Sequence, residues 1–334
     1  MTADGDTLRV LAKRYREFAL VEARGVSALY EALASFIADC PEILTFIAAL
    51  PVDRQQPNLF LAAVRYIAGV QQSGDQLIQA VRGRADDIRR IMLSKTTQTN
   101  EPARCAVLLP LLALLPQPIA LLEVGASAGL CLLPDRYGYD YGSTILEPKG
   151  GGHLPTPIFP CTVSAGTPLP TAVPTILWRA GLDVNPLDVR SQADRAWLET
   201  LVWPDQTDRA ARLRAAMAIA RSDPPRIVRG DLFSDLGPLL NEVPPEATAV
   251  VFHTAVLGYV RGQSRRDQFA EAMLASPAVW ISNESPRVFP SMAKAAPEPV
   301  SPDQFLLSVN GTPVAWTGPH GQSLDWFGAI PLPD

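Results

Sequence analysis

The second half of the chain alternates short apolar runs with helical stretches, and this alternation constrains the fold more than any other feature. The strand-like runs are residues 119–124, 175–184, 226–230, 248–253 and 278–284. Apolar strands that alternate with helices, here residues 192–202 and 208–221, predict a parallel sheet covered on both faces. Asn310-Gly311 between two further alternating runs predicts a terminal β-hairpin.

Residues before about 115 show only helical periodicity. Apolar residues recur at three-to-four spacing in Leu8–Leu20, Ser27–Ala38 and Leu59–Val70, and a charged helix is expected from about Gly74 to Leu93. We therefore expect an all-α domain over residues 1–115 and an α/β domain over residues 116–334.

One long segment of the α/β region carries neither pattern. Residues 134–174 hold eight prolines and six glycines, Gly150–Gly152 among them. A loop of this length inside a compact domain is usually functional, so we expect a lid or a small hairpin over the sheet edge. Tyr137, Tyr139 and Tyr141 alternate as in a strand, and either wall a pocket or pack within this insertion.

Composition excludes several classes of partner. The net charge is −5, and the arginines are scattered without a basic run, which argues against nucleic acid and anionic membranes. The apolar run Cys105–Leu122 is interrupted by prolines and is expected to be a helix end, a turn and a buried strand, not a membrane span. Four cysteines without a CxxC pair, and no signal-peptide pattern at the N-terminus, favour the cytoplasm. A small molecule is the expected partner, and oligomeric state has no sequence signal.

The most informative motif is LLEVGASAGL (121–130). An apolar strand ends at Glu123, and a turn of small residues follows. Its candidate ligand-binding positions are Glu123, Gly125, Ala126, Ser127 and Gly129. Glycines at a strand-to-helix turn let the backbone approach a ligand, and a helix N-terminus offers free N–H groups. The pattern is E-x-G-x-x-x-G instead of G-x-G-x-x-G, and an acidic residue there repels a pyrophosphate and suits an amine-bearing ligand. The alternative is a βα turn without a ligand.

This motif resembles motif I of class I S-adenosylmethionine-dependent methyltransferases, in which the acidic residue lies below the amino acid part of the ligand. The resemblance implies that Asp183 in GLDVNP contacts the ribose hydroxyls and that Asp231 in RIVRGDLFSDL lies near adenine. A helix N-cap is the alternative role of Asp231. Five parallel strands and a hairpin are similar to the Rossmann-like core of these enzymes, which is the fold that we expect for residues 116–334.

A wider set of segments resembles one bacterial family, a domain of unknown function with a methyltransferase-like core. These segments are TNEPAR (99–104), LLEVGASAGLCLLPDRYGYDYG (121–142), WRAGLDVNPLDV (178–189), LVWPDQTDRAARL (201–213), VFHTAVLGY (251–259) and GPHGQSLDW (318–326). The resemblance extends from residue 10 onwards. It implies that Asn100 and Arg104 reach the ligand cleft, and their alternative is a capping pattern with an ion pair.

Three residues near strand ends are candidates for the chemistry. His253 ends the fourth strand run, and histidine is the side-chain type most often used for proton transfer at neutral pH; its alternative is a buried histidine bonded within the protein. Glu284 at the end of the fifth run is a second acid or base, or a capping residue, and Tyr259 orients a substrate or packs. The three histidines are too dispersed in the sequence to predict a metal site.

The expected function is S-adenosylmethionine-dependent methyl transfer to a small molecule, with the helical domain and the insertion closing over the acceptor. The alternative keeps the fold and the ligand but not the methyl transfer, because fold does not fix function. Residues 252–255 lack the Asn/Asp-Pro-Pro-Tyr signature of many amine methyltransferases, which keeps that alternative open. No G-x-G-x-x-G follows the first strand, and no P-loop or H-E-x-x-H occurs, so other nucleotide and zinc enzymes are not expected.

Overall fold

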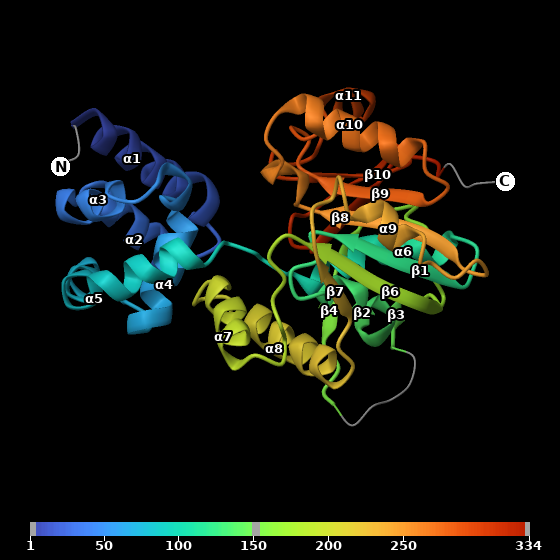
Figure 1. The fold of residues 1–334 in the computed structure, drawn as a ribbon, viewed down its shortest axis with the longest axis horizontal. Helices are drawn as coiled ribbons and strands as arrows, with labels where there is room; N and C mark the ends of the chain where they lie inside the picture. Colours follow the sequence, from blue (N-terminus) through green and yellow to red (C-terminus); the bar gives the residue numbers. More distant parts are fainter. Residues whose placement is uncertain (1–4, 149–153, 331–334) are drawn as a thin grey trace. The chain divides into compact units, whose positions relative to one another are not determined.

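The computed structural model describes residues 5–148 and 154–330, and the chain forms two compact units (Figure 1). Unit 1 comprises Met1–Thr99 and Gln192–Ala211, and unit 2 comprises Asn100–Ser191 and Arg212–Asp334. The expected boundary at residue 115 therefore moves to residue 99, and a later segment returns to unit 1.

Unit 1 is helical, as the periodicity predicted. Its N-terminal segment contains α1 (Gly5–Glu17), a π-helical turn (Phe18–Ala23), α2 (Ala28–Ala38), α3 (Pro41–Ala48), a 3-10 turn (Val52–Arg54), α4 (Pro57–Ala68) and α5 (Gly74–Ser94). The Ser27 hydroxyl accepts a hydrogen bond from the backbone N–H of Tyr30 and caps α2, and Ser73 caps α5 in the same way.

The later segment of unit 1 contains α7 (Gln192–Leu201) and the start of α8 (Thr207–Ser222). Trp197 of α7 is fully buried, and its indole N–H donates to the carbonyl of Thr96 at 3.0 Å. Lys95 and Asp194 form an ion pair at 2.9 Å. These contacts hold the later segment to the N-terminal helices of the same unit.

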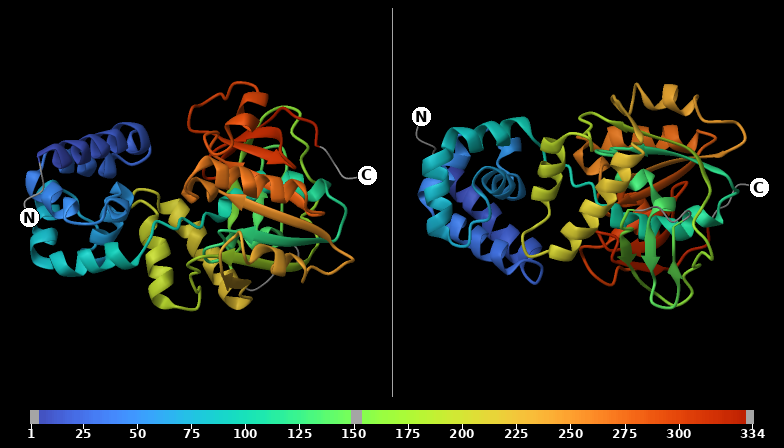
Figure 2. Two further views of the ribbon diagram at one scale, coloured as in Figure 1. Left: turned by 45° about the horizontal axis from the view of Figure 1, so that its top comes forward. Right: turned by 90° about the horizontal axis from the view of Figure 1, so that it is seen from below.

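A nine-stranded, mostly parallel sheet organises unit 2 (Figures 1 and 2). Its strands are β1 (Ile119–Val124), β5 (Thr162–Val163), β6 (Ile176–Asp183), β7 (Arg226–Arg229), β8 (Thr248–Thr254), β9 (Val279–Glu284), β10 (Phe305–Val309), β11 (Thr312–Thr317) and β12 (Ser323–Trp326). They lie in the order β5-β12-β11-β10-β9-β8-β1-β6-β7. β1 is flanked by parallel β6 and β8, so the strand order reverses beside β1. Ligands of open α/β sheets bind at the carboxyl ends of strands at such a switch point.

The expected parallel strands and terminal hairpin are confirmed at close to their predicted bounds. Asn310 and Gly311 both adopt positive φ, 46° and 76°, between antiparallel β10 and β11, as a two-residue hairpin turn requires. The antiparallel part continues through β12, which the sequence prediction did not separate from the hairpin.

The two faces of the sheet differ in their covering. α9 (Leu236–Leu240) and α10 (Gln263–Leu274) cover one face, where Leu122, Val251 and Trp280 pack with residues of both helices. We call this face A. Side chains alternate along a strand, so Glu123 and Arg179 lie on the opposite face, face B. Every residue of β1 is buried, which agrees with a sheet covered on both sides.

The apolar run Cys105–Leu122 folds as predicted, into a helix, a turn and a strand. It forms α6 (Cys105–Leu114), of which all but the last two residues are buried, and then enters β1. Among the described residues, no helix combines the length and the apolar composition that crossing a bilayer requires.

The 134–174 insertion folds into β2 (Gly138–Asp140), β3 (Ile145–Leu146) and β4 (Ile158–Pro160), which form a separate sheet in the order β3-β2-β4, while β5 joins the main sheet beside β12. The hydroxyls of Tyr137, Tyr139 and Tyr141 donate to backbone carbonyls at 2.9, 2.6 and 2.7 Å. All three tyrosines are buried, so they pack and fix the insertion instead of lining an open pocket. Gly150–Gly152 of the insertion, and His153, one of the three histidines of the chain, lie outside the described residues.

Candidate functional site

The turn after β1 is tightly packed against the rest of unit 2. Gly125, Ser127 and Gly129 have φ values of 72°, 52° and 74°, in the left-handed region. A Cβ atom on Gly125 would overlap the side chain of Val256, and one on Gly129 would lie 2.7 Å from Ile227. Both positions therefore need glycine for conformation and for space, and protein atoms fill the space beside them.

The expected helix after this turn is corrected by the structure. A 3-10 turn over Leu130–Leu132 follows, not an α-helix with free N–H groups. Asn100 accepts a hydrogen bond from the N–H of Leu130 at 3.0 Å, and Pro134, which has no N–H, prevents a continuous helix. Gly125 and Ala126 both donate to the carbonyl of Leu182, so most donors of the turn are used within the protein.

Asp183 and Asp231, which the resemblance assigns to the ligand, both bind backbone in this structure. The buried Asp183 carboxylate accepts hydrogen bonds from the N–H groups of Ser127 and Asn185, each at 2.7 Å. It thereby ties the end of β6 to the turn after β1. Asp231 is exposed and accepts from the N–H of Phe233 at 2.8 Å within a turn, and the N-cap of the following helix α9 is Asp235, so Asp231 is not the helix N-cap given as its alternative. Their ligand contacts remain predictions.

Glu123 is the most unusual group at the strand ends. It is 2% exposed, and its Oε2 atom has no hydrogen-bond partner among the described residues. Burial, and then the neighbouring Cys131 and Asp183, raise the pKa of the Glu123 carboxyl well above its usual value, and only Arg104 opposes them. The hydroxyl of Ser127 is also buried without a described partner. A buried polar group without a partner is costly, so this place is suited to a donor from outside the protein.

Arg104 extends from a 3-10 turn, Pro102–Arg104, that precedes α6. Its Nε donates to the carbonyl of Pro319 at 2.9 Å, and its Nη1 donates to the carbonyl of Thr254 at 3.1 Å. The guanidinium thus covers the end of β8. The structure therefore brings Asn100 against the turn after β1 and Arg104 over the neighbouring strand.

His253 and Glu284 form a pair, but on face A. The ring Nδ1 of His253 lies 2.7 Å from Glu284 Oε1, and its Nε2 accepts from the indole N–H of Trp280 at 3.0 Å. An indole N–H can only donate, so Nε2 of His253 accepts and the neutral ring carries its proton on Nδ1. The Nδ1–H group donates a hydrogen bond to Glu284. His253 is fully buried. Both nitrogens are engaged, so the geometry gives His253 a positioning role and leaves no nitrogen for a substrate proton.

Glu284 also caps the chain after β8. Its Oε1 accepts from the N–H groups of Val256 and Leu257 at 2.8 and 3.0 Å. Tyr259 ends the 3-10 turn that begins at Leu257, and its side chain is exposed. The structure therefore joins two of the three predicted chemistry residues in one buried network and leaves Tyr259 at the surface.

Sequence reasoning missed a polar group at the ends of β8, β9 and β11. Thr254 pairs with Asn283 across β8 and β9, and both lie on face B with Glu123. Asn283 Oδ1 accepts from the Thr317 hydroxyl at 2.7 Å, but its Nδ2 is buried without a described partner. Polar residues at the end of an apolar strand were the available signal. Among the described residues, no three His, Cys, Asp or Glu side chains are placed to hold a metal ion.

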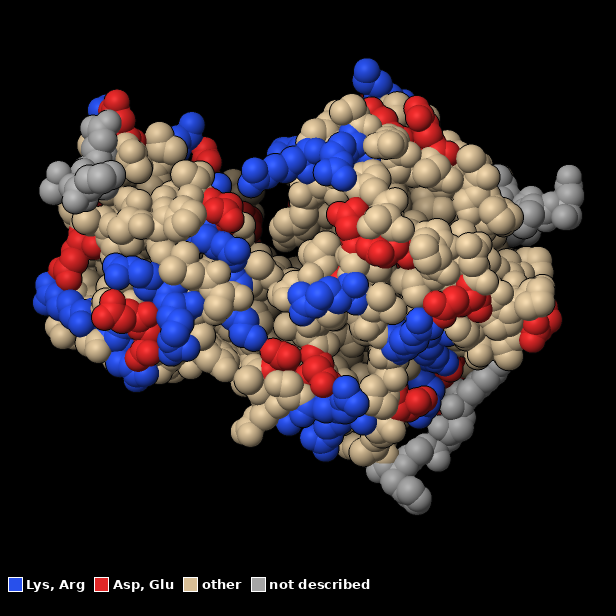
Figure 3. Space-filling view, in the orientation of Figure 1, with Lys and Arg blue, Asp and Glu red and all other residues tan. Residues whose placement is uncertain are grey.

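The candidate site at the carboxyl ends of the strands is distinguished by buried charged groups, not by charge at the surface. On the face seen in Figure 3, basic side chains lie interspersed with acidic ones over both units. Arg104 and Glu123, by contrast, are 6% and 2% exposed.

Comparison with known proteins identifies a family whose description names no reaction. No curated protein and no solved structure matches the sequence. One family model matches residues 12–326, nearly the whole chain, and its description is "Uncharacterized protein conserved in bacteria (DUF2332)". The chain therefore belongs to the bacterial family DUF2332. This agrees with the expected membership of a bacterial family of unknown function.

Proposed function

We propose that unit 2 has a Rossmann-like methyltransferase core and binds S-adenosylmethionine, with the Glu123 carboxylate accepting the ammonium group of the ligand. The observation that carries the proposal is the buried carboxyl of Glu123 without a hydrogen-bond partner among the described residues. A cationic donor stabilises the ionised form of a carboxyl whose pKa burial has raised. The proposed activity is transfer of the ligand's methyl group to a small molecule.

The topology supports this placement. Parallel strands numbered as they occur along the chain lie in the order 3-2-1-4-5, from β7 through β1 to β9. Glu123 is the penultimate residue of the central strand, at the carboxyl edge where ligands of open α/β sheets bind. Ser127, with its buried unpartnered hydroxyl, follows within the same turn. The two groups together provide an acceptor and a hydroxyl for one polar ligand.

The packing of the turn limits how a ligand fits. Because Val256 and Ile227 occupy the space beside Gly125 and Gly129, the ligand is expected to contact side chains instead of the glycine backbone. S-adenosylmethionine, held through Glu123, would supply an electrophilic methyl group on its sulfonium sulfur for transfer to an acceptor. The protein's part is to hold and orient both molecules.

Calorimetric titration with S-adenosylmethionine tests the proposal. Wild type is expected to bind, and Glu123→Gln to bind about 10- to 100-fold more weakly, the effect of losing one charged hydrogen bond. Glu246→Gln, at an exposed glutamate of the same unit, is the matched control. Because a bound ammonium group lowers the raised pKa of Glu123, binding to wild type is expected to release protons at some pH between about 5 and 8, measurable with buffers of different ionisation enthalpy. No binding by wild type contradicts the proposal.

A second candidate is a module that binds the same ligand without methyl transfer. The engagement of both His253 nitrogens favours it, because the best sequence candidate for a general base then has no free nitrogen. Incubating the loaded protein with a small-metabolite extract separates the two: formation of S-adenosylhomocysteine supports transfer, and saturable binding without it supports the module.

A further inference from the structure

Arg104 is a buried cation without a bonded counter-ion. It is 6% exposed, and its contacts with the described residues are to neutral groups, with no salt bridge among them. Its hydrogen bonds go to the carbonyls of Pro319 and Thr254 and, at 3.4 Å, to the hydroxyl of Thr254. The ring of Phe305 lies 5.9 Å from the guanidinium carbon. Neutral oxygens and an aromatic face do not cancel the charge, and a buried charge is normally paired.

Glu123 does not serve as that counter-ion. The two side chains influence one another, since Arg104 lowers the pKa of Glu123, but burial raises this pKa by more. Neither group hydrogen-bonds the other in the structure. The guanidinium therefore remains available to an anion that enters beside it.

A second donor without a partner among the described residues lies on the same face of the sheet, one strand away. Asn283 is fully buried, its Oδ1 is held by Thr317, and its Nδ2 has no hydrogen-bond partner among the described residues. The bond from Thr317, which donates to Oδ1, fixes which end of the amide is the donor. Asn283 is the register partner of Thr254, to which Arg104 is bonded, so the amide and the guanidinium lie over neighbouring strands on face B.

We propose that Arg104 and Asn283 form a subsite for the carboxylate of a small molecule, the second ligand of unit 2. A carboxylate accepts from a guanidinium and an amide at once and supplies the missing negative charge. The subsite lies over β8 and β9, whereas Glu123 lies on β1, so the two ends of the site have opposite chemistry. The subsite itself is argued from Arg104 and Asn283 alone. Only the identification of its ligand as the methyl acceptor rests on the proposed function.

NMR titration with sodium acetate, against sodium chloride at equal ionic strength, tests the subsite. The side-chain signals of Arg104 Nε–H and the Asn283 amide are followed in wild type, with and without saturating S-adenosylmethionine. Saturable shifts with acetate beyond those with chloride are expected. Asn283→Leu, which cannot donate, is expected to weaken the response of Arg104 at least about tenfold. Asn283→Asp, which places a carboxylate beside Arg104, is expected to abolish it.

The control is Arg261→Gln, at an exposed arginine in the same unit, which is expected to leave the response unchanged. Glu123→Gln is expected to lose S-adenosylmethionine binding but to keep the acetate response, so failure of the proposed function and failure of the subsite are distinguishable. Equal shifts with acetate and chloride overturn the subsite. An unchanged response in Asn283→Leu overturns it as well, and shows an adventitious ion only.

Discussion

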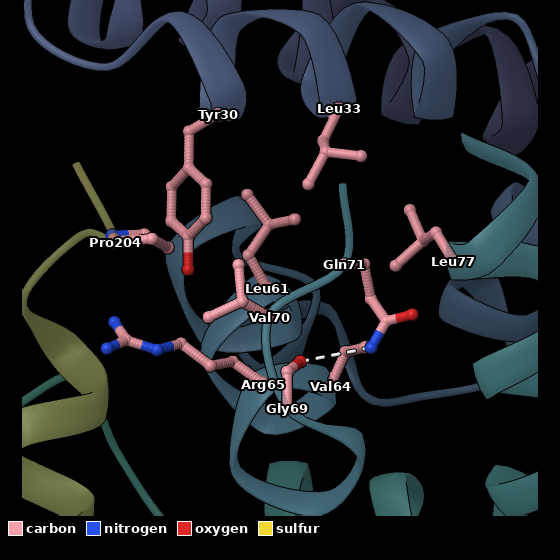
Figure 4. Close-up of a pocket in the computed structure, with 10 residues that line it drawn as sticks. All are labelled: Tyr30, Leu33, Leu61, Val64, Arg65, Gly69, Val70, Gln71, Leu77 and Pro204. Atoms are coloured by element: carbon pink, nitrogen blue, oxygen red, sulfur yellow. Dashed lines mark hydrogen bonds between the residues drawn. The ribbon is translucent and has the colours of Figure 1, made fainter. Parts of the chain in front are cut away.

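Unit 1 and unit 2 both bury polar atoms without partners, but in different surroundings. In unit 1, the hydroxyl of Tyr30 points into a small pocket (Figure 4). The pocket walls are mostly aliphatic side chains, and they include Leu33, Leu61, Val64 and Leu77. In the described part of unit 2, by contrast, three of the four unpartnered atoms belong to Glu123, Ser127 and Asn283, at or just after the ends of the sheet strands, and the fourth is Nε of Arg266 on α10.

This difference shows how an unpartnered polar atom that is only a packing defect can be distinguished from one that belongs to a candidate ligand site. Burial raises the pKa of Tyr30 to about 12, so its hydroxyl stays neutral and costs only a lost hydrogen bond. The unit 2 atoms combine an acidic group, an amide donor and the cation Arg104 on one face of the sheet. A neutral hydroxyl that has only the Arg65 side chain beside it is tolerated, whereas several charged and polar groups without bonded partners on one face of a sheet imply a ligand.

The largest expected effect concerns the turn that carries Pro319. Gly321 has a φ of 79°, and an added Cβ would overlap the backbone carbonyl of Ala103 beside Arg104. Gly321→Ala is expected to destabilise unit 2 by about 3 kcal/mol or more, from conformational strain and overlap together. Gly25→Ala in unit 1 is the control, because Gly25 has a φ of 76° and open space around it.

Hydrogen exchange followed by peptide separates the two units in this experiment. Gly25→Ala is expected to cost only about 1 kcal/mol, from conformation alone. Equal losses of protection in the two variants would show that the turn does not press on the segment that carries Arg104.

A smaller effect is expected from pH. Glu123 has a raised pKa in the folded chain, so between the unfolded and folded pKa values the folded state binds more protons. The free energy of unfolding therefore falls as pH rises above about 4.5, by up to about 1.4 kcal/mol per pH unit. The difference between wild type and Glu123→Gln, measured from pH 5 to 8, is expected to follow this slope. Parallel curves for the two proteins would contradict it.

The smallest effect compares two buried tyrosines. Tyr30→Phe removes a hydroxyl whose only polar neighbour that lowers its pKa is the Arg65 side chain, without a hydrogen bond of good geometry, and is expected to change stability by less than about 1 kcal/mol. Tyr141→Phe removes a hydroxyl that donates to the carbonyl of Ala106 at 2.7 Å and is expected to cost about 1 to 2 kcal/mol. Thermal unfolding of both variants measures the contrast, and a clear loss in Tyr30→Phe would mean that its hydroxyl has a partner.

The sequence allowed the main strands and the hairpin to be predicted because their signals are local. Apolar runs such as 119–124 and the Asn310-Gly311 turn carry their own periodicity and conformational preference. In the 134–174 insertion, β2 lies where Tyr137, Tyr139 and Tyr141 alternate, and it pairs antiparallel with β3 as a small hairpin. The parallel pairing of β2 with β4 had no sequence signal, since only the partner strand defines it. The helix expected after Gly129 failed because Asn100 and Pro134 act against it, one of them through a tertiary contact.

The candidate site was only partly predictable for a related reason. Glu123 and Arg104 were recognised by their motifs, but Asn283 has no motif and becomes notable only when the strand register places it beside Thr254. The register also separates His253 from Glu123, because the two side chains lie on opposite faces. A linear sequence shows which residues end a strand, and the pairing of strands decides which of them meet.

The pKa of Glu123 is the measurement that tests the central claim most directly. Carbon-detected NMR of its side-chain carboxyl, assigned with Glu123→Gln, follows the titration in the free protein and with saturating S-adenosylmethionine. The account predicts a pKa well above the usual value in the free protein and a marked decrease when the ligand's ammonium group binds. A usual pKa in the free protein, or a raised pKa that the ligand leaves unchanged, would contradict the claim that Glu123 is kept for a cationic ligand.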